Sequence, residues 1–243
     1  MERLSKSNVL ALASSSGDAS NCDLTGLKLR GVELLGMNFD GSDLKGTDLS
    51  SANLSGSSFR NADLTGCNMG SSNFTGCSFL KAHLDKADLT YSSFVGADFR
   101  SAALVEADFT NSHLSGAVFE KADLTGANIQ TVDGAMVRCS GAIMAKVHAR
   151  GASLIGAVLS GCDLRGSILH GTDMSNADLS SADLREADIL DATLTAADLR
   201  NADVRGARLK RTDLTRAKLD GLKYDEELRE LISRYAGPYN LQG

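Results

Sequence analysis

Residues 177–201 read ADLSS ADLRE ADILD ATLTA ADLRN, five blocks that follow one plan. Each block begins with alanine, usually continues with aspartate, and carries leucine or isoleucine in third place. A period of five fits neither the 3.6-residue turn of an α-helix nor the two-residue alternation of a flat strand. The chain is therefore expected to form short extended segments separated by turns, each pointing one small and one large side chain inward.

The same period runs through most of the chain. From Leu24 to Leu219 a large apolar residue occupies every fifth position, 40 positions without an insertion, and only Gly134, Cys139 and Ala149 depart from it. Burial sets this phase, because all eight phenylalanines fall in it. Of the 24 glycines, 19 lie two residues after the large apolar residue, where a turn needs a positive φ.

This pattern resembles the pentapeptide-repeat family, whose consensus is Ala-(Asp/Asn)-Leu-X-X. Residues 62–66 (ADLTG), 177–181 (ADLSS) and 197–201 (ADLRN) match it directly, and the resemblance covers about 200 of the 243 residues. It implies an all-β fold, a right-handed quadrilateral β-helix (a solenoid) with four pentapeptides per coil. Forty pentapeptides then make about ten coils, a rod of roughly 48 Å at ~4.8 Å per coil. One column would contain Phe39, Phe59, Phe79, Phe99 and Phe119.

Three segments are expected: a capping segment at 1–21, the β-helix at 22–221, and a C-terminal helix and tail at 222–243. Both ends of a coil stack expose strand edges and need short capping helices. Residues 2–13 are the predicted N-terminal plug, with apolar side chains at Leu4, Val9, Leu10 and Leu12.

At the other end, Asp225 is expected to cap a helix that runs to Ala236, with Gly237 and Pro238 as stop signals. An apolar stripe follows this helix, formed by Leu228, Leu231, Ile232 and Tyr235. The stripe either covers the last coil or also forms a homodimer seam, as C-terminal elements do in gyrase-binding relatives; both interpretations stay open.

Composition excludes several classes. Asp+Glu (31) exceeds Lys+Arg (25), for a net charge of −6, which argues against direct nucleic-acid binding. No apolar stretch approaches the roughly 18 residues of a membrane span. The apolar run at 9–13 is shorter than the ~7 to 15 residues of a signal peptide core, so we expect a cytoplasmic protein.

The residues also predict no enzyme, cofactor or metal site. All five cysteines fall on inward positions and none has C-x-x-C spacing. The four histidines fall on outward positions, and we expect no Ser, Cys or Lys beside them. A rod without insertions is also expected to lack a concave pocket.

Function is therefore expected on the outer faces. Asp precedes the large apolar residue in 17 of the 40 repeats. The resulting acidic column contains Asp23, Asp43, Asp63, Asp163, Asp183 and Asp203. Such carboxylates either accept hydrogen bonds from turn N–H groups or imitate DNA phosphates. Arg165, Arg185 and Arg205 form a neighbouring column that is expected to screen them.

Residues 132–158 depart most from the consensus, and they contain a candidate partner surface. Its members are Met136, Arg138, Ile143, Ile155 and Val158. On the third of the four faces of the expected β-helix, one outward column takes every twentieth residue from Leu35 through Val95 to Thr215. All of its residues are uncharged. Exposed apolar groups often mark a contact site, although degenerate repeats also arise by drift.

Two functions fit these observations, both for a non-enzymatic protein-binding solenoid. The resemblance implies a DNA mimic that binds DNA gyrase, a type II topoisomerase, and protects it from an antibiotic or toxin. Against this stands a basic stretch at 195–223, with eight basic and four acidic residues. The alternative is a scaffold or adaptor that binds proteins through its neutral face and central apolar patch.

Overall fold

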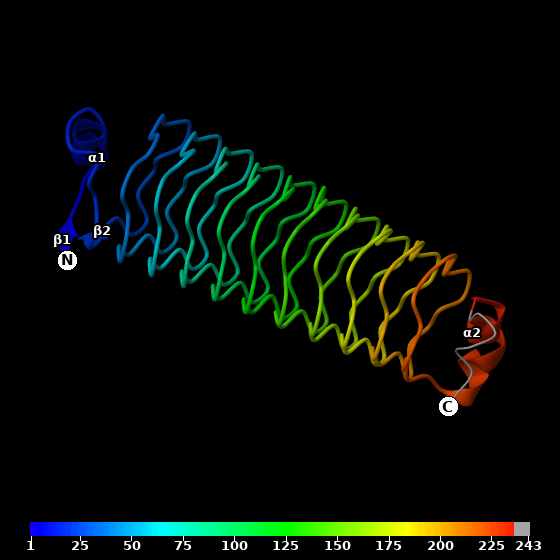
Figure 1. The fold of residues 1–243 in the computed structure, drawn as a ribbon. Helices are drawn as coiled ribbons and strands as arrows, with labels where there is room; N and C mark the ends of the chain where they lie inside the picture. The colour runs from blue at the N-terminus through cyan, green and yellow to red at the C-terminus, as the bar shows by residue number, and fades with distance from the viewer. Residues whose placement is uncertain (236–243) are drawn as a thin grey trace.

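The structure is a computed structural model that describes residues 1–235. Figure 1 shows a straight rod of stacked coils with a helix at each end. The right-handed quadrilateral β-helix expected from the sequence is confirmed. Its bridges are all parallel and all join residues 20 apart, from Asp18 with Asn38 to Asp203 with Lys223. Four pentapeptides therefore make one coil throughout, without a slip in register.

The backbone of each repeat is held in the same way. The N–H of Leu24 donates to the carbonyl of Asp43 (2.8 Å), and that of Gly26 donates to Lys45 (2.9 Å), both in the next coil. The N–H of Asp43 donates to Cys22 in the previous coil (2.9 Å). The N–H of Leu27 donates to Leu24 (3.1 Å) and closes the turn.

Every turn contains a residue in the left-handed conformation. All 41 positions from 21 to 221 in steps of five have a positive φ, although only 19 of them are glycine. This conformation costs an L-residue roughly 1–2 kcal/mol. Even the β-branched Thr131 adopts it (φ 53°), and its Oγ1 donates to Asn111 Oδ1 at 2.6 Å. Stacking of the coils thus imposes the turn, and glycine relieves its strain without being required.

The phenylalanine column predicted from the sequence is confirmed. Ring centroids of Phe39, Phe59 and Phe79 lie 5.0 Å apart with nearly parallel planes. A second stack, which the 20-residue register places on the adjacent face, joins Phe74 and Phe94 at 5.2 Å. Rings from the two stacks meet edge to face, with their centroids about 6 Å apart. Aromatic pairs prefer this geometry. All eight rings are buried.

Gly134 stands where a large core residue is expected, yet it leaves little space. A Cβ built there would lie 3.1 Å from Leu154 Cδ2 and 3.2 Å from the carbonyl of Ser153. Atoms of Leu154 and Ser153 in the next coil therefore occupy the space beside Gly134. A larger side chain at position 134 would push the two coils apart.

The N-terminal segment extends the rod before covering it. Strand β1 (Glu2–Arg3) pairs in parallel with β2 (Cys22–Asp23), again 20 residues apart. Helix α1 (Lys6–Ala13) begins at a capping box in which Ser5 and Asn8 exchange hydrogen bonds. Val9 is fully buried, whereas Leu10 is 39% exposed and contributes little to the expected plug.

The C-terminal segment differs from the expectation at its start. A 3-10 turn η1 (Glu226–Leu228) leads into α2 (Arg229–Tyr235). Asp225 does not cap this helix with its side chain; instead, its Oδ2 accepts the N–H of Gly206 (2.5 Å). Asp225 is the N-cap residue, as predicted, but it caps through its backbone carbonyl, which accepts the N–H of Leu228 (2.9 Å). Its carboxylate is used by the N–H of Gly206 at the end of the rod.

Ile232 in α2 is buried. The expected helix end at Ala236 and the stop signals Gly237 and Pro238 lie outside the described residues. In residues 1–235 the longest helix, α1, has eight residues, far fewer than the ~20 that cross a bilayer.

Inward hydroxyl groups follow a common rule with one exception. Thr47 Oγ1 donates to the carbonyl of Leu24 (2.8 Å), and Ser112 Oγ donates to that of Leu89 (2.6 Å). Ser167 occupies an equivalent position and is completely buried, but its Oγ has no hydrogen-bond partner. A buried hydroxyl without a partner costs about 1–3 kcal/mol.

We therefore expect Ser167→Ala to stabilise the protein by about 1 kcal/mol, because it removes an unpaired polar group at little cost in packing. The matched control Ser112→Ala should destabilise it by about 1–2 kcal/mol, since two hydrogen bonds are lost. Urea unfolding followed by circular dichroism measures both. Equal losses of stability in the two variants would contradict this account of Ser167.

Candidate interaction surfaces

The outer wall consists of four faces separated by four corners. Faces 1 to 4 follow chain order, with strand centres at Asp23, Lys28, Glu33 and Asn38 and at every twentieth residue after each. The two residues after each central apolar residue form the corner that leads to the next face. Side chains at strand centres and corners point outward, and these are the surfaces a partner can reach.

The strand-centre aspartates have a structural role. Between residues 25 and 220, no backbone carbonyl accepts the N–H of the residue that follows the central apolar one. In 16 of the 17 repeats with aspartate, the carboxylate accepts this N–H; Thr25 and Asp23, at 2.9 Å, are an example. The exception is Asp133. Aspartate is thus the acceptor for a backbone donor that the coil ladder leaves unpaired.

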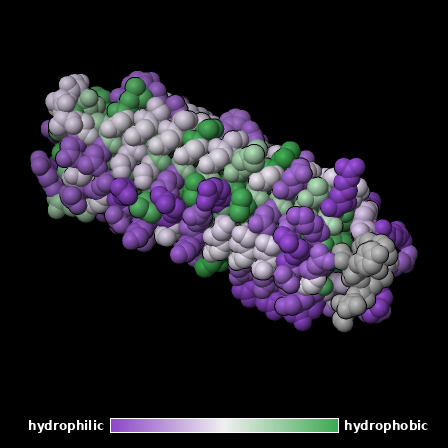
Figure 2. Space-filling view, in the orientation of Figure 1, coloured by the Kyte–Doolittle hydropathy of each residue, from purple (hydrophilic) through white to green (hydrophobic). Residues whose placement is uncertain are grey.

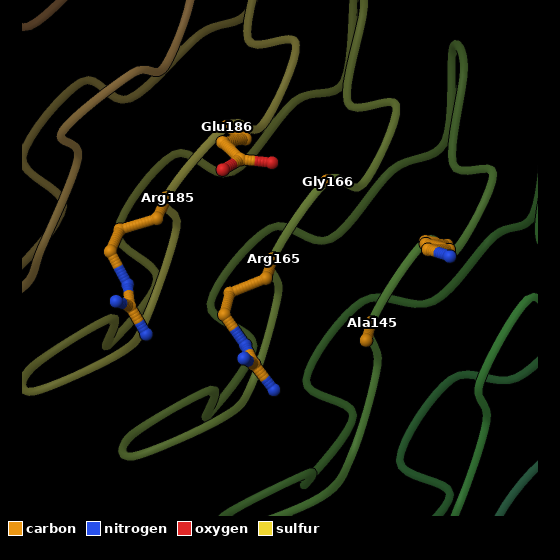
Figure 3. Close-up of a pocket in the computed structure, with 6 residues that line it drawn as sticks. Ala145, Arg165, Gly166, Arg185 and Glu186 are labelled. Atoms are coloured by element: carbon orange, nitrogen blue, oxygen red, sulfur yellow. The ribbon is translucent and has the colours of Figure 1, made fainter.

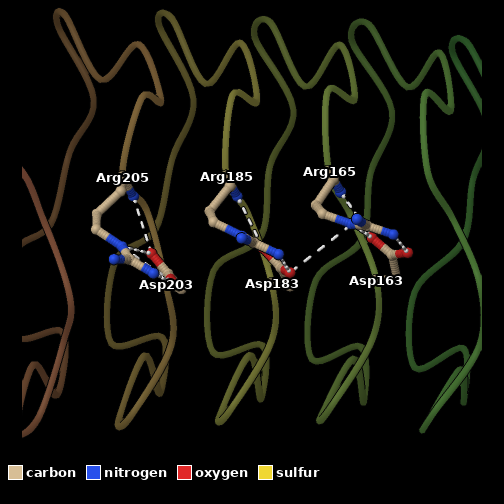
Figure 4. A network of polar contacts seen from close by, with 6 residues as sticks. All are labelled: Asp163, Arg165, Asp183, Arg185, Asp203 and Arg205. Carbon is tan, nitrogen blue, oxygen red and sulfur yellow. Dashed lines mark hydrogen bonds and ion pairs between the residues drawn. The ribbon is translucent and has the colours of Figure 1, made fainter.

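The six candidate residues of the acidic column are also paired with cations. Asp163, Asp183 and Asp203 each bind the arginine two residues later, through Nε and Nη2, with Nη2 at 2.6 Å (Figure 4). Each arginine therefore forms a fork with the carboxylate of its own repeat, and Arg165 also approaches Asp183 at 3.7 Å. These hydrogen bonds hold the pKa of the three carboxyls below the usual 3.8.

The N-terminal half of the same column is neutralised too. Arg3 binds Asp23 at 2.9 Å, and Lys45 bridges Asp43 at 3.3 Å and Asp63 at 2.8 Å. Each of the six carboxylates is paired with a cation. A DNA mimic would instead present a row of exposed, unpaired negative charges.

A shallow hollow of about 330 Å³ lies beside the column of arginines that includes Arg165 and Arg185 (Figure 3). It is lined by Lys146, Arg165, Arg185 and Glu186, with Ala145 and Gly166 as its floor. Both arginine side chains extend in the same direction, towards their own aspartates. Among the residues that line the hollow, both arginines are held in ion pairs with aspartates.

The five candidate partner-surface residues do not form one patch. Met136 and Ile155 lie together at the corner between faces 3 and 4, where Met136 Sδ covers Gly156. Arg138 and Val158 are paired on face 4, and Arg138 is bound to Glu120 at 2.7 Å. Ile143 lies on face 1, beyond a further corner. Sequence proximity had grouped side chains that the coil turns in different directions.

The corner between faces 3 and 4 is free of charge over nine coils. We call it the uncharged corner, formed by residues 35, 55, 75, 95, 115, 135, 155, 175 and 195 together with the residue after each. Leu35 is 59% exposed, Val95 40%, Met136 66% and Ile155 40%. On the side of the rod in Figure 2, hydrophobic residues likewise lie as separate spots along its length, while hydrophilic ones are dense near the C-terminal end.

One expectation about chemistry was wrong: His113 does have a serine beside it. Ser93, His113 and Asp133 occupy successive coils of face 3. This row was predictable from the sequence, because residues 20 positions apart lie side by side in neighbouring coils. However, Ser93 Oγ bonds Thr75 Oγ1 (2.9 Å), and His113 Nδ1 is 3.7 Å from Asp133 Oδ2. The ladder also uses the N–H groups of Ser93 and Phe94.

The thiols are poor nucleophiles. Burial raises the pKa of Cys67, Cys77 and Cys162 to about 12 and that of Cys139 well above its usual value. All five cysteines are free. Within residues 1–235 no three His, Cys, Asp or Glu side chains are grouped so as to hold a metal ion.

The apolar stripe of α2 faces the last coil. Ile232 is buried in the core, and Leu228, Leu231 and Tyr235 pack against it while remaining partly exposed. Leu228 and Leu231 also border a hollow of about 470 Å³ that includes Leu190 and Leu209. The stripe thus covers the end of the rod, and Ile232 is not available to a second molecule.

Comparison with known families agrees with this architecture. A family model described as pentapeptide repeats matches eight times, over residues 20–56, 42–79, 52–90, 67–104, 92–130, 137–171, 159–201 and 192–223. The chain belongs to the pentapeptide-repeat family. No curated protein matches it.

Solved pentapeptide-repeat structures are similar along most of their length. HetL from Nostoc sp. strain PCC 7120, a protein involved in heterocyst differentiation regulation, is 27% identical, with a TM-score of 0.65. The alignment covers 90% of this chain and 96% of HetL. A trypsin-treated form of QnrB1, a plasmid-mediated fluoroquinolone resistance protein, is 20% identical with a TM-score of 0.57, covering 85% of this chain and 96% of QnrB1. The QnrB1 likeness concerns the fold alone.

The aspartate–arginine forks predict how stability depends on pH. Hydrogen bonds from arginine lower the pKa of Asp98, Asp163 and Asp183 in the folded protein below 3.8. Such groups stabilise the fold above the unfolded pKa, and the contribution is lost as the pH falls through the folded value. We expect a urea midpoint that is nearly constant above about pH 5 and falls below about pH 4.

The triple variant Asp98→Asn, Asp163→Asn, Asp183→Asn keeps an oxygen acceptor for the turn and removes the three titrating groups. Its midpoint should fall less steeply below pH 4 than that of the unmodified chain. Parallel curves for the two proteins would show that other groups cause the acid loss.

Proposed function

We propose that this pentapeptide-repeat protein is a non-enzymatic scaffold that binds protein partners along the uncharged corner. The observation that carries the proposal is the division of the outer surface. The strand-centre acids are engaged by turns and cations, whereas Leu35, Val95, Met136 and Ile155 are exposed at one corner without any covering element. Rows of exposed apolar side chains on a soluble rod favour a protein contact.

The rod suits this role because its coils hold side chains at fixed intervals. Eight coil steps separate residues 35 and 195, about 38 Å at ~4.8 Å each. A partner that lies along the corner meets a preformed surface and pays little ordering entropy on the scaffold side. The regulatory role in the description of HetL, the more similar of the two relatives, supports a binding function. Free, buried thiols support a reducing, cytoplasmic location.

Site-specific photo-cross-linking tests the surface. A photoreactive amino acid at position 155 should yield covalent adducts with protein in the cells that express the chain, because it lies on the uncharged corner. The matched control is position 65, at the corner between faces 1 and 2, where we expect none. Adducts of equal yield from both positions would remove the special role of the corner.

The gyrase alternative needs carboxylates that are free to replace DNA phosphates. The pairing of all six candidate aspartates weakens it. We expect the purified protein neither to inhibit supercoiling by DNA gyrase nor to protect the enzyme from a quinolone. Inhibition or protection at micromolar protein would replace the scaffold proposal with the DNA-mimic one.

A further inference from the structure

At the first of the two residues in each turn of the uncharged corner, the exposed apolar side chains are evenly spaced. Leu35, Val95 and Ile155 are separated by 60 residues each, which is three coils in a register that never slips. Between them stand only small residues, Ser55 and Thr75 on one side and Ser115 and Ala135 on the other. From either end, this first column of the corner therefore presents one large apolar side chain, two small ones, a large one, two small ones and a large one.

A contact between two antiparallel copies related by a twofold axis requires the same order of side chains in both directions along the surface. In a symmetric dimer each residue meets the image of the residue equidistant from the axis, so the contact must be complementary to itself. We propose that two copies of this chain associate antiparallel along the uncharged corner, with the axis at Val95. Leu35 then meets Ile155 of the second copy, and Val95 meets its own image. This inference rests on the proposed function and names the partner.

Met136 supports the same register. It lies two coils beyond Val95, so the rotation places it against the coil of Gly56. A Cβ built on Gly56 would have nothing within 4 Å, and Met136 is the most exposed large apolar side chain of the corner, at 66%. A large side chain on one copy thus faces an open glycine on the other, twice per dimer.

Charges on the adjoining faces are compatible with this arrangement. On face 3 the rotation brings Asp133 towards Asn53 and His113 towards Asn73. Asp133 is the one strand-centre aspartate whose carboxylate does not bind the turn. It accepts the hydroxyl of Ser115 (3.3 Å) and lies 3.7 Å from His113, and its remaining lone pairs can accept an amide donor. On face 4, Asp98 approaches its own image, but Arg100 neutralises it through Nε and Nη2.

Each of the other three corners carries charge, and the one between faces 4 and 1 contains Asp40, Arg60, Arg100 and Glu120. The corner between faces 1 and 2 carries Arg165, Arg185 and Arg205 in succession, and that between faces 2 and 3 carries Arg30 and Arg150. The same rotation would place Arg30 against Arg150 of the second copy. Since seven coils of one corner form a narrow contact, we expect weak, concentration-dependent association of the kind typical of small interfaces.

Cysteine cross-linking tests the axis directly, in a chain that carries Cys22→Ser because the other four thiols are buried. Val95→Cys should form a disulfide-linked dimer under mild oxidation, since residue 95 meets itself. Thr75→Cys should not, because its image lies two coils away, ~9.6 Å, beyond the ~7 Å reach of a disulfide. The double variant Thr75→Cys, Ser115→Cys should cross-link again.

Sedimentation velocity over roughly two orders of magnitude in concentration gives the second readout. We expect a monomer–dimer equilibrium that Val95→Lys shifts to monomer. Leu35→Glu alone should weaken the dimer, and Leu35→Glu with Ile155→Lys should restore it through two new ion pairs.

A monomer at every concentration, cross-linking of Thr75→Cys as readily as Val95→Cys, or a dimer lost with Leu231→Glu but not with Val95→Lys would each overturn this dimer. If adducts at position 155 contain a different protein and the chain is monomeric, the dimer is excluded while the scaffold function stands.

Discussion

One unpaired backbone donor underlies the composition of this protein. In each repeat the coil ladder accepts three N–H groups and the turn accepts a fourth, as at residues 24, 26, 43 and 27. The fifth, on the residue after the central apolar one, has no carbonyl within reach. Such a donor needs a side chain or water as its partner, and aspartate or asparagine two residues earlier is placed to accept it. Where the strand centre lacks that acceptor, the coil before can supply it: Asp40 accepts the N–H of Arg60, and Asp85 that of Val105.

This constraint separates structural from variable positions on the surface. The strand-centre acid serves its own repeat, so its frequency carries little information about partners. The two corner residues make no comparable demand beyond a left-handed turn, and their side chains are free to differ between coils. Differences between corners are therefore the place where binding specificity can be built into a uniform rod, and the uncharged corner differs most from the others.

The sequence was sufficient for features that follow from the period alone. A register of twenty predicts the phenylalanine column, and the hydrogen-bonding preference of aspartate predicts its role in turns. Features that depend on side-chain direction were not predictable in the same way. Ile143 and Met136 are seven residues apart, yet a corner turns them onto different faces. The arginines were expected to screen the aspartate column, and they do so; the fork in which each guanidinium binds the carboxylate of its own repeat is the detail that the structure adds. Asp225 stands at the N-cap as predicted, but its carboxylate accepts the N–H of Gly206 at the end of the rod, a contact that the helix pattern alone does not indicate.

Met136 shows how a departure from the repeat can be weighed physically. Its position has a positive φ (61°), and the equivalent position is glycine in the five preceding coils, from Gly36 to Gly116, and in the next, Gly156. A side chain here accepts a cost of roughly 1 kcal/mol, and with two thirds of its surface exposed methionine recovers little of it by burial within the monomer. The fold does not require this residue. Met136 is the first break in this glycine column, which later contains Asn176, Ala196 and Arg216. A second surface that covered the exposed methionine would offset the cost. An exposed apolar side chain at such a position is therefore a better indicator of a contact than the regular acidic columns.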